Sequence, residues 1–507
     1  MRRSIALIVS LFASTAFAQP KLQAPPAPPQ AKQPPPPAAP SGAPWDKSGI
    51  KDWTKVPAPT KEPTFKPPVP KRSKLKNGMS LLLIENHALP IVSMAMVVPS
   101  AGAAVDPTAK AGLASFTADL LDEGAGDLSA IQIAEEQDRL GASIRAYADV
   151  DSAGVSVSTL TKTLEPTVDL VTKIVTQPKF DAKEFERVKG DRMTSLELRR
   201  DRPREVAAIM LNAALYGADS AYGHPASGMR ETFKDIAVGD VQTFYKERWN
   251  PAAMTLIVAG DFDAKALKTK LDATLGAWKP TGAKKPEKIA AKPAALGKRL
   301  LLADRKDSAQ SDVRIGLVGI DRKDKRYYQL EVLANALGGS FTSRLNNRLR
   351  EQLGITYGVR AGEDYRAQPG PFLISTAIVT PSTGQGLSET IKILDDLAAN
   401  DLPKDELEKA KQNLIRALPA QFDTNAATVA SYADLLTYGL PDNWYASYAT
   451  NIKKVNAAQV KAAAKTLIPS KSFVVSIVGD LSKIKADIDK LGFGDALMHD
   501  LYGQPAK

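Results

Sequence analysis

The chain has 507 residues, of which 44% are hydrophobic and 24% are charged, and its formal net charge is +11. A chain of this length and composition can bury a large core, and it contains no cysteine, which excludes a small domain stapled by disulfides. The basic excess is modest and partly carried by linkers, so we expect no nucleic-acid partner.

The first 18 residues have the pattern of a signal peptide. Arg2 and Arg3 precede an apolar run at residues 5–12, and a small-residue cleavage site ends at Ala18. The apolar run is too short to span a bilayer, and no later segment is long enough, so we expect no transmembrane segment. The sequence predicts cleavage near Ala18 and a periplasmic or secreted protein.

Two stretches have the composition of unfolded connections. Residues 19–70 hold 17 of the 36 prolines, which predicts an extended, disordered lead. Residues 279–298 hold six lysines and three prolines without an aromatic residue, which predicts a solvated linker. The chain is therefore expected to place folded domains at residues 71–278 and 299–507.

The first folded region alternates strand and helix patterns. We expect strands or strand pairs at residues 79–84, 91–98, 143–159 and 254–258, and helices at residues 109–121, 129–140, 164–176, 181–199 and 204–215.

The pattern repeats in the second region. Residues 256–261 reappear as residues 475–480, and residues 186–189 correspond to residues 408–411. Near-constant offsets indicate a duplicated unit of roughly 220 residues. The predicted fold class is α+β, with two homologous domains that each pack an antiparallel-rich sheet against helices.

One stretch of the second domain, SRLNNRLREQLGITYGV at residues 343–359, combines a helix, a turn and a strand. Its apolar stripe recurs at four-residue steps, at Leu345, Leu349 and Leu353. Gly354 stands where a helix ends, and residues 355–359 have strand composition.

Two polar side chains flank that turn. Arg350 lies near the helix end and Tyr357 on the strand, so both could donate hydrogen bonds to one carbonyl oxygen. The alternative from the residues alone is a buried leucine stripe with a solvated arginine and a half-buried tyrosine.

The stretch resembles the C-terminal signature of the insulinase, pitrilysin and mitochondrial processing peptidase family of inverted-motif zinc peptidases. In that family an Arg and a Tyr seven positions apart hold the substrate backbone over the zinc, and Arg350 and Tyr357 match in type and spacing. Other segments that resemble family landmarks are Asn77-Gly78-Met79, Asp106-Pro107, Gly112-Leu113-Ala114, Leu140-Gly141-Ala142 and Asn250-Pro251. The resemblance runs from about Lys71 onward and implies one half of a peptidase clamshell.

The resemblance also locates a zinc motif that has degenerated. Active members carry H-x-x-E-H on the helix expected at residues 109–121, where two His bind the metal and the Glu takes a proton from its water. The positions that match the motif and the later third ligand hold Ser115, Ala118, Asp119 and Ser195. One carboxylate does not hold zinc, so we expect neither a catalytic residue nor a bound metal in this chain.

The remaining candidate ligands do not restore the site. The three histidines, His87, His224 and His499, have no ligand partner four positions away. A small acidic cluster, Asp119, Asp122 and Glu123, is expected to be a solvated helix end rather than a cation site.

In two-subunit members of the family, one chain carries the zinc motif and its sister carries the Arg/Tyr pair. The resemblance therefore implies the non-catalytic, substrate-binding subunit of a periplasmic zinc metallopeptidase. Its partner would be a homologous, zinc-containing subunit, and the heterodimer would act on unfolded peptides. Two alternatives are a structural or peptide-binding protein that has lost peptidase function, and a solitary enzyme with another metal site, whose ligands the sequence does not supply.

Overall fold

In a computed structural model of the chain, the structure describes residues 65–99, 101–279 and 300–506. The predicted signal peptide, most of the proline-rich lead and nearly all of the predicted linker lie outside these residues. Below, residues 65–279 are called the N-terminal half and residues 300–506 the C-terminal half; both belong to one unit.

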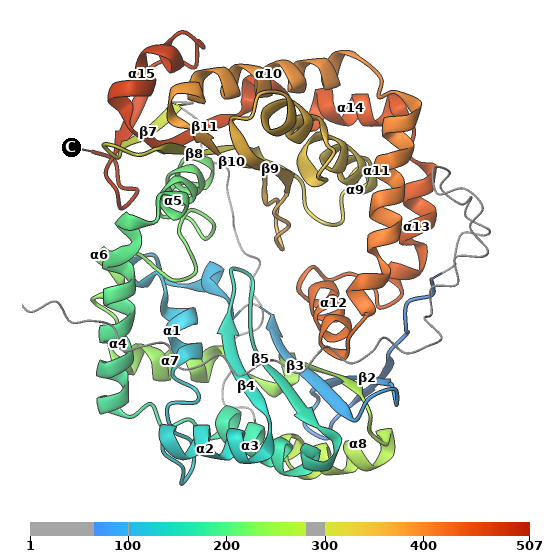
Figure 1. The fold of residues 1–507 in the computed structure, drawn as a ribbon. Coiled ribbons are helices and arrows are strands. Elements are labelled where there is room, and N and C mark those ends of the chain that lie inside the picture. The colour runs from blue at the N-terminus through green and yellow to red at the C-terminus, as the bar shows by residue number, and fades with distance from the viewer. Residues whose placement is uncertain (1–64, 100, 280–299, 507) are drawn as a thin grey trace, which may run out of the picture. The chain divides into compact units, whose positions relative to one another are not determined.

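Each half is built on a six-stranded sheet (Figure 1). The N-terminal sheet has the order β1-β2-β6-β3-β5-β4, with β1 (Lys71–Lys74), β2 (Ser80–Glu85), β3 (Ile91–Pro99), β4 (Ser143–Ala148), β5 (Ser152–Leu160) and β6 (Thr255–Gly260). The C-terminal sheet has the order β12-β7-β11-β8-β10-β9, with β7 (Leu300–Asp304), β8 (Gln310–Val318), β9 (Thr356–Glu363), β10 (Pro371–Val379), β11 (Val474–Gly479) and β12 (Ala496–His499).

The two sheets share one topology. The repeated sequence forms β6 and β11, which occupy the same position and pair in parallel with β2 and β7, respectively. Most other pairs are antiparallel, as expected. Only the outermost strand beside β2 or β7 differs. In the N-terminal sheet this strand is β1, which precedes β2 in the chain, whereas in the C-terminal sheet it is β12, which follows β11. The α+β fold with two homologous domains is thus confirmed.

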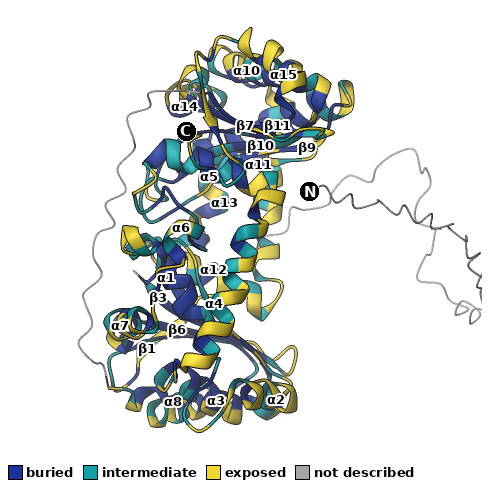
Figure 2. Ribbon diagram, turned by 90° about the vertical axis from the view of Figure 1, so that its left-hand side faces the viewer, coloured by how far each residue is buried: buried dark blue, intermediate teal, exposed yellow. Residues whose placement is uncertain are grey.

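Helices cover both sheets. In the N-terminal half they are α1 (Leu113–Asp119), α2 (Ala130–Leu140), α3 (Leu164–Thr176), α4 (Ala182–Glu197), α5 (Pro203–Tyr216), α6 (Arg230–Phe233), α7 (Val238–Arg248) and α8 (Ala264–Ala273). In the C-terminal half they are α9 (Tyr327–Ala334), α10 (Thr383–Ala399), α11 (Lys404–Ala417), α12 (Asn425–Thr437), α13 (Trp444–Lys454), α14 (Ala457–Leu467) and α15 (Leu481–Asp489), with two π-helical turns, η8 (Asn335–Gly339) and η9 (Asn346–Gln352). Figure 2 shows buried strands and helices such as α2 and α8 with exposed faces. None of the described helices is both long and apolar enough to cross a bilayer.

The helix that should carry the zinc motif is shorter than expected. α1 begins only at Leu113, because Gly112 before it has a left-handed backbone with φ of 102°. A side chain at Gly112 would place its Cβ 2.9 Å from the Gly228 backbone, so this entry to the helix requires glycine. The residues before it, Thr108–Lys110, form a separate 3-10 turn.

Each half lends one helix to the other half's sheet. α5 packs on β8 and β11, and α12 packs on β3 and β6 (Figure 1). The Ser476 hydroxyl on β11 donates a hydrogen bond to the Ala207 carbonyl of α5 at 2.9 Å, and Asn425 at the start of α12 donates to the Ile91 carbonyl at 2.9 Å. The two domains are therefore joined through their cores.

Candidate functional site

The leucine stripe at residues 343–359 forms the inner face of a helical turn, but that turn is a π-helix instead of the expected α-helix. Leu345 and Leu349 are fully buried, and Gly354 ends the turn with φ of 65°. The wide turn is closed by a hydrogen bond from the Ile355 amide to the Leu349 carbonyl at 3.0 Å. π-turns are uncommon and frequently occur at functional sites.

Asn346 fastens this turn to β9. Its side-chain amide donates to the Val359 carbonyl at 2.9 Å and to the Ser340 carbonyl at 3.0 Å, while its oxygen accepts from the Val359 amide at 2.8 Å. The side chain thus supplies both partners that a neighbouring strand would offer to Val359. Asn346 was not among the residues that the sequence pattern singled out; its one signal was an amide placed three positions before Leu349, at the edge of the apolar stripe.

A β-bulge sets the position of Tyr357. Thr376 on β10 pairs with Val359, whereas Ile378 pairs with Thr356, so two residues of β9 oppose one of β10 between them. Bulges of this kind re-aim a side chain at the sheet edge. The Tyr357 side chain is 91% exposed, so the half-buried tyrosine of the alternative interpretation is wrong.

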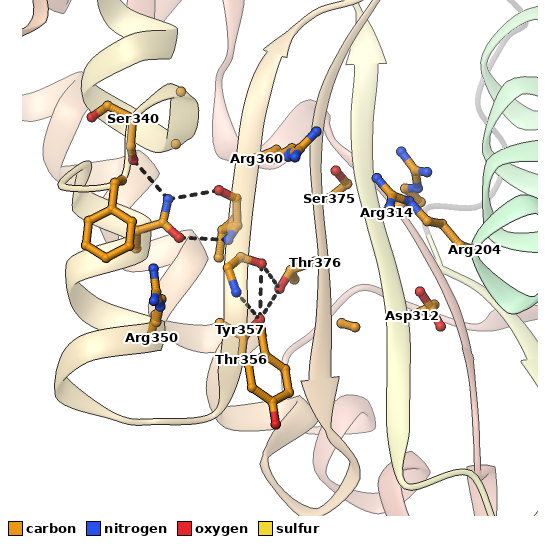
Figure 3. A pocket seen from close by; sticks show the side chains of 17 residues that line it. Arg204, Asp312, Arg314, Ser340, Arg350, Thr356, Tyr357, Arg360, Ser375 and Thr376 are labelled. Atoms are coloured by element: carbon orange, nitrogen blue, oxygen red, sulfur yellow. Dashed lines mark hydrogen bonds between the residues drawn. The ribbon is translucent and has the colours of Figure 1, made fainter. Parts of the chain in front are cut away.

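Arg350 and Tyr357 line one pocket, which has a volume of about 540 Å³ (Figure 3). The Arg350 guanidinium stacks 4.1 Å from the centre of the Phe341 ring, and its side chain is 36% exposed. Its only ion pair among the described residues is a long one, 3.4 Å from Nε to a Glu351 carboxylate oxygen. Both predicted donors are therefore accessible from one pocket; their substrate-binding role stays a prediction.

Glycines let the wall of the pocket approach β9. A Cβ at Gly338, in η8, would lie 2.7 Å from the Ala361 Cβ. Only glycine at position 338 allows the two backbones to lie this close. Gly338 and Gly339 line the pocket together with Ser340.

At the degenerate zinc positions, an arginine stands between the residues that replace the ligands. Arg192 of α4 donates to the Ser115 hydroxyl at 3.1 Å and to the Ser227 carbonyl at 3.1 Å, and it forms an ion pair with Asp119. Ala118 is fully buried and offers no polar atom, and Ser195 lies on the same helix as Arg192. The guanidinium supplies positive charge at this site from within the chain.

Zinc does not fit this site. Its ligands are His, Cys or carboxylate, and of the four matching positions only Asp119 carries such a group, which Arg192 already binds. The described residues contain no cluster of three or more potential metal-ligating side chains.

The acidic cluster after α1 is also divided among arginines. Glu123 forms an ion pair with Arg187, as Asp119 does with Arg192. Burial raises the pKa of Asp119, and burial with the neighbouring Glu123 and Asp119 charges raises the pKa of Asp122 to about 6. Asp119 and Glu123 form ion pairs within the fold and Asp122 is partly buried, so the cluster differs from the solvated helix end that we expected.

The three histidines lie in separate places. His87 contacts the Asp261 carboxylate at 2.7 Å, and burial lowers the pKa of both His224 and His499.

Comparison with known proteins agrees with this architecture. Residues 81–224 match the family model described as Insulinase (Peptidase family M16), and residues 235–414 match that of the peptidase M16 inactive domain. The uncharacterized zinc protease YmxG of Bacillus subtilis is 25% identical over 349 residues, covering 68% of this chain and 82% of that protein. The non-peptidase homolog YmxG of Helicobacter pylori is 21% identical, covering 79% of this chain and 92% of that protein.

The fold also matches solved structures. The peptidase M16 inactive domain from Pseudomonas fluorescens superposes with a TM-score of 0.75 at 24% identity, covering 81% of this chain and 98% of that chain. The two sheet-and-helix domains thus have the fold of one half of the M16 clamshell. With Ser115, Ala118, Asp119 and Ser195 at its metal positions, the chain belongs to the M16 insulinase family as a member that lacks the zinc motif.

Proposed function

We propose that this chain is the non-catalytic, substrate-binding subunit of a periplasmic zinc metallopeptidase, paired with a homologous subunit that carries H-x-x-E-H. The observation that carries the proposal is a contrast between two sites. Arg192 fills the site of the zinc motif, whereas Arg350 and Tyr357 remain accessible on one pocket. The signal-peptide pattern supports the location, and the non-peptidase name of the Helicobacter relative supports the absence of catalysis.

In the proposed complex, Arg350 and Tyr357 bind the carbonyl of the scissile peptide bond. The guanidinium and the phenol hydroxyl each donate a hydrogen bond to its oxygen, and these bonds strengthen as the oxygen gains negative charge. Stacking on Phe341 limits the motion of Arg350, so less conformational freedom is lost when substrate binds. The partner subunit would supply the metal, the attacking water and the general base.

The first experiment is affinity purification of this chain at its native expression level, followed by an assay of the eluate for peptide cleavage that a chelator abolishes. The proposal expects a co-eluting homologue with H-x-x-E-H and activity that neither chain has alone. A chain that elutes without a homologue and without activity would contradict it.

Variants of the assembled complex test the two residues. Arg350→Ala and Tyr357→Phe should each lower kcat/KM by about 30- to 1,000-fold, because losing one oxyanion donor costs roughly 2 to 4 kcal/mol. Arg348→Ala is the matched control, since Arg348 does not line the pocket and donates to Glu389 at 2.7 Å. Wild-type cleavage rates in both Arg350→Ala and Tyr357→Phe would refute the roles given to these residues.

The alternative function is a structural or peptide-binding protein that has lost peptidase function altogether. The contacts of Arg192 at the degenerate zinc positions suit this alternative equally well, because neither function requires this chain to bind zinc. In that case the chain would bind peptides with no peptidase among its co-purifying proteins.

A further inference from the structure

A row of arginines crosses the C-terminal sheet beside the Arg350 pocket. Ser375 on β10 lies directly opposite Arg314 on β8 and directly opposite Arg360 on β9. Directly opposed residues of antiparallel strands share one face, so both arginines flank Ser375 on the same face of the sheet. Figure 3 shows Arg314 and Arg360 on either side of Ser375.

Two further arginines come from outside the sheet. Arg204 reaches this face from α5, the helix that the N-terminal half lends to the C-terminal sheet, and Figure 3 shows it beside Arg314. Arg350 enters from η9 on the opposite side. Four arginines from four elements therefore line one pocket of about 540 Å³.

The negative charge in this pocket does not balance the positive charge. Asp312 is the only acidic residue among those lining the pocket. Within the described parts of the chain, no hydrogen bond or ion pair joins Arg204, Arg314 or Arg360 to a carboxylate. Burial and the nearby Arg204 charge both lower the pKa of Arg314, so an anion bound here would relieve this repulsion.

Neighbouring arginines show that carboxylate partners are available in this part of the fold. Arg344 donates to Glu406 at 2.7 Å and to Asp396 at 2.5 Å. Arg348 donates to Glu389 at 2.7 Å. Arg204, Arg314 and Arg360 differ from these two in lacking such a partner among the described residues, which points to a counter-charge supplied by a ligand.

We propose that this arginine pocket is a subsite that binds a carboxylate of the substrate peptide. The choice of a peptide as the ligand rests on the proposed function. The carboxylate is either an acidic side chain or the free C-terminus, since a guanidinium binds both in the same bidentate way. Arg350 and Tyr357 line the same pocket as Arg314 and Arg360, so a peptide bound to the first pair lies within reach of the second pair. A peptide held by Arg350 and Tyr357 would thus place a neighbouring carboxylate near Arg314 and Arg360.

Calorimetric titration of the purified full chain tests this subsite with three alanine-based peptides. The first has blocked ends and two central glutamates, the second has glutamines in their place, and the third has no acidic side chain but a free C-terminal carboxylate. We expect the first or the third to bind at least about tenfold more tightly than the second at low salt, and the advantage to shrink as salt is added. The peptide that shows the advantage identifies the source of the carboxylate.

Variants locate the binding. Arg360→Gln, an exposed position whose change spares the core, and Arg314→Gln should each reduce the affinity for the carboxylate peptide at least about tenfold. Arg416→Gln is the matched control, since it removes the same charge from an exposed position on α11 outside the pocket. Unfolding of each variant in urea checks that the fold is retained.

Three results would overturn the inference. The first is equal binding of the glutamate, glutamine and free-terminus peptides, and the second is an affinity in both Arg314→Gln and Arg360→Gln that equals that of the wild type. The third is tighter binding of inorganic phosphate or a single-stranded oligonucleotide than of any peptide. Because the chain is assayed alone, these results are separate from the proposed function. An active heterodimer without carboxylate preference refutes only the subsite, whereas carboxylate binding by a chain that forms no active complex refutes only the peptidase role.

Discussion

The two halves turn from helix to edge strand at equivalent corners, and they use the corner differently. A left-handed glycine follows each helical turn: Gly141 comes directly after α2 and Gly354 comes two positions after η9, with φ of 60° and 65°. Gln137 stands four positions before the first glycine, as Arg350 does before the second. The Gln137 side chain accepts a hydrogen bond from the Ile144 amide of β4 at 2.7 Å, and so closes its corner from within.

In the C-terminal corner, a different side chain forms the hydrogen bonds to the edge strand. Asn346 binds both backbone groups of Val359, which leaves Arg350 without a bond to β9. The residue three positions after the glycine also differs, because Ile144 is 3% exposed and Tyr357 is 91% exposed. A duplicated corner can thus present two polar side chains when a different side chain fastens the strand.

The largest effect is expected from Asn346→Leu, which would remove the fastening of the C-terminal corner. The Val359 amide and carbonyl would lose buried partners, so the free energy of unfolding should fall by about 2 to 4 kcal/mol. Urea unfolding measures this loss. Asn347→Leu is the control, because Asn347 is exposed and makes one bond, to the Thr342 carbonyl. Equal stability of the two variants would mean that Asn346 does not hold the corner.

Next in size is Arg192→Met, which would empty the sealed site of the N-terminal half. The partly buried Asp119 would lose its counter-charge, so we expect a loss of about 2 kcal/mol at neutral pH. Burial already raises the pKa of Asp119, and without Arg192 the folded-state value should rise further above the unfolded one. The folded state then binds the proton more tightly than the unfolded state does. Stability is therefore retained below the unfolded-state pKa of Asp119 and is lost as the pH rises from that pKa through the raised folded-state pKa.

Urea unfolding of Arg192→Met between pH 5 and pH 8, roughly, checks that sign. Asp119→Asn in the same background should recover part of the loss at the higher pH, since the amide carries no charge. A loss that is independent of pH would show that Arg192 acts through packing alone.

A smaller effect is expected from Gln137→Ala, at the N-terminal corner. One hydrogen bond to the Ile144 amide disappears, which should cost about 1 kcal/mol of unfolding free energy and leave peptide affinity unchanged. Arg350→Ala should show the reverse: reduced peptide affinity with nearly unchanged stability. If both variants lower stability alone, the two corners have the same role.

The smallest effect concerns the start of α2, which has a capping box that η9 lacks. The Gln132 amide donates to the Ser129 hydroxyl, and the Ser129 amide donates to the Gln132 side chain at 2.9 Å. Ser129→Ala should cost about 1 kcal/mol in thermal or urea unfolding, whereas Ser129→Gly should cost only about a few tenths. Equal losses would indicate that the hydroxyl contributes nothing to the cap.

Local patterns in the sequence located much of this fold. The helix at residues 164–176 has the predicted bounds, and the helix expected at residues 129–140 matches α2, which Ser129 caps and Gly141 follows. The repeated segments at residues 256–261 and 475–480 correctly indicated equivalent strands. Such features depend on neighbours within a few positions, which a pattern of apolar and turn residues records.

The features that shape the two sites depend on distant partners. Arg192 meets Ser115 only because α4 packs against α1, and no local signal marks that contact. Arg314 and Arg360 share a face only through the register of three strands. The π-turn was also hidden, because the same leucine spacing suits an α-helix and only the hydrogen bonds distinguish the two.

The exchanged helices α5 and α12 also bear on how the chain can fold. Residues Val206, Met210 and Leu215 of α5 are buried against a sheet whose strands begin at Leu300, so the N-terminal half has no surface of its own for them. During synthesis, the apolar face of α5 stays exposed until β8 and β11 have been synthesised. Contacts of such long range slow folding, and fragments cut between the halves should aggregate when separate and regain structure only when mixed. We therefore expect each copy of the duplicated domain to depend on the other for a complete core.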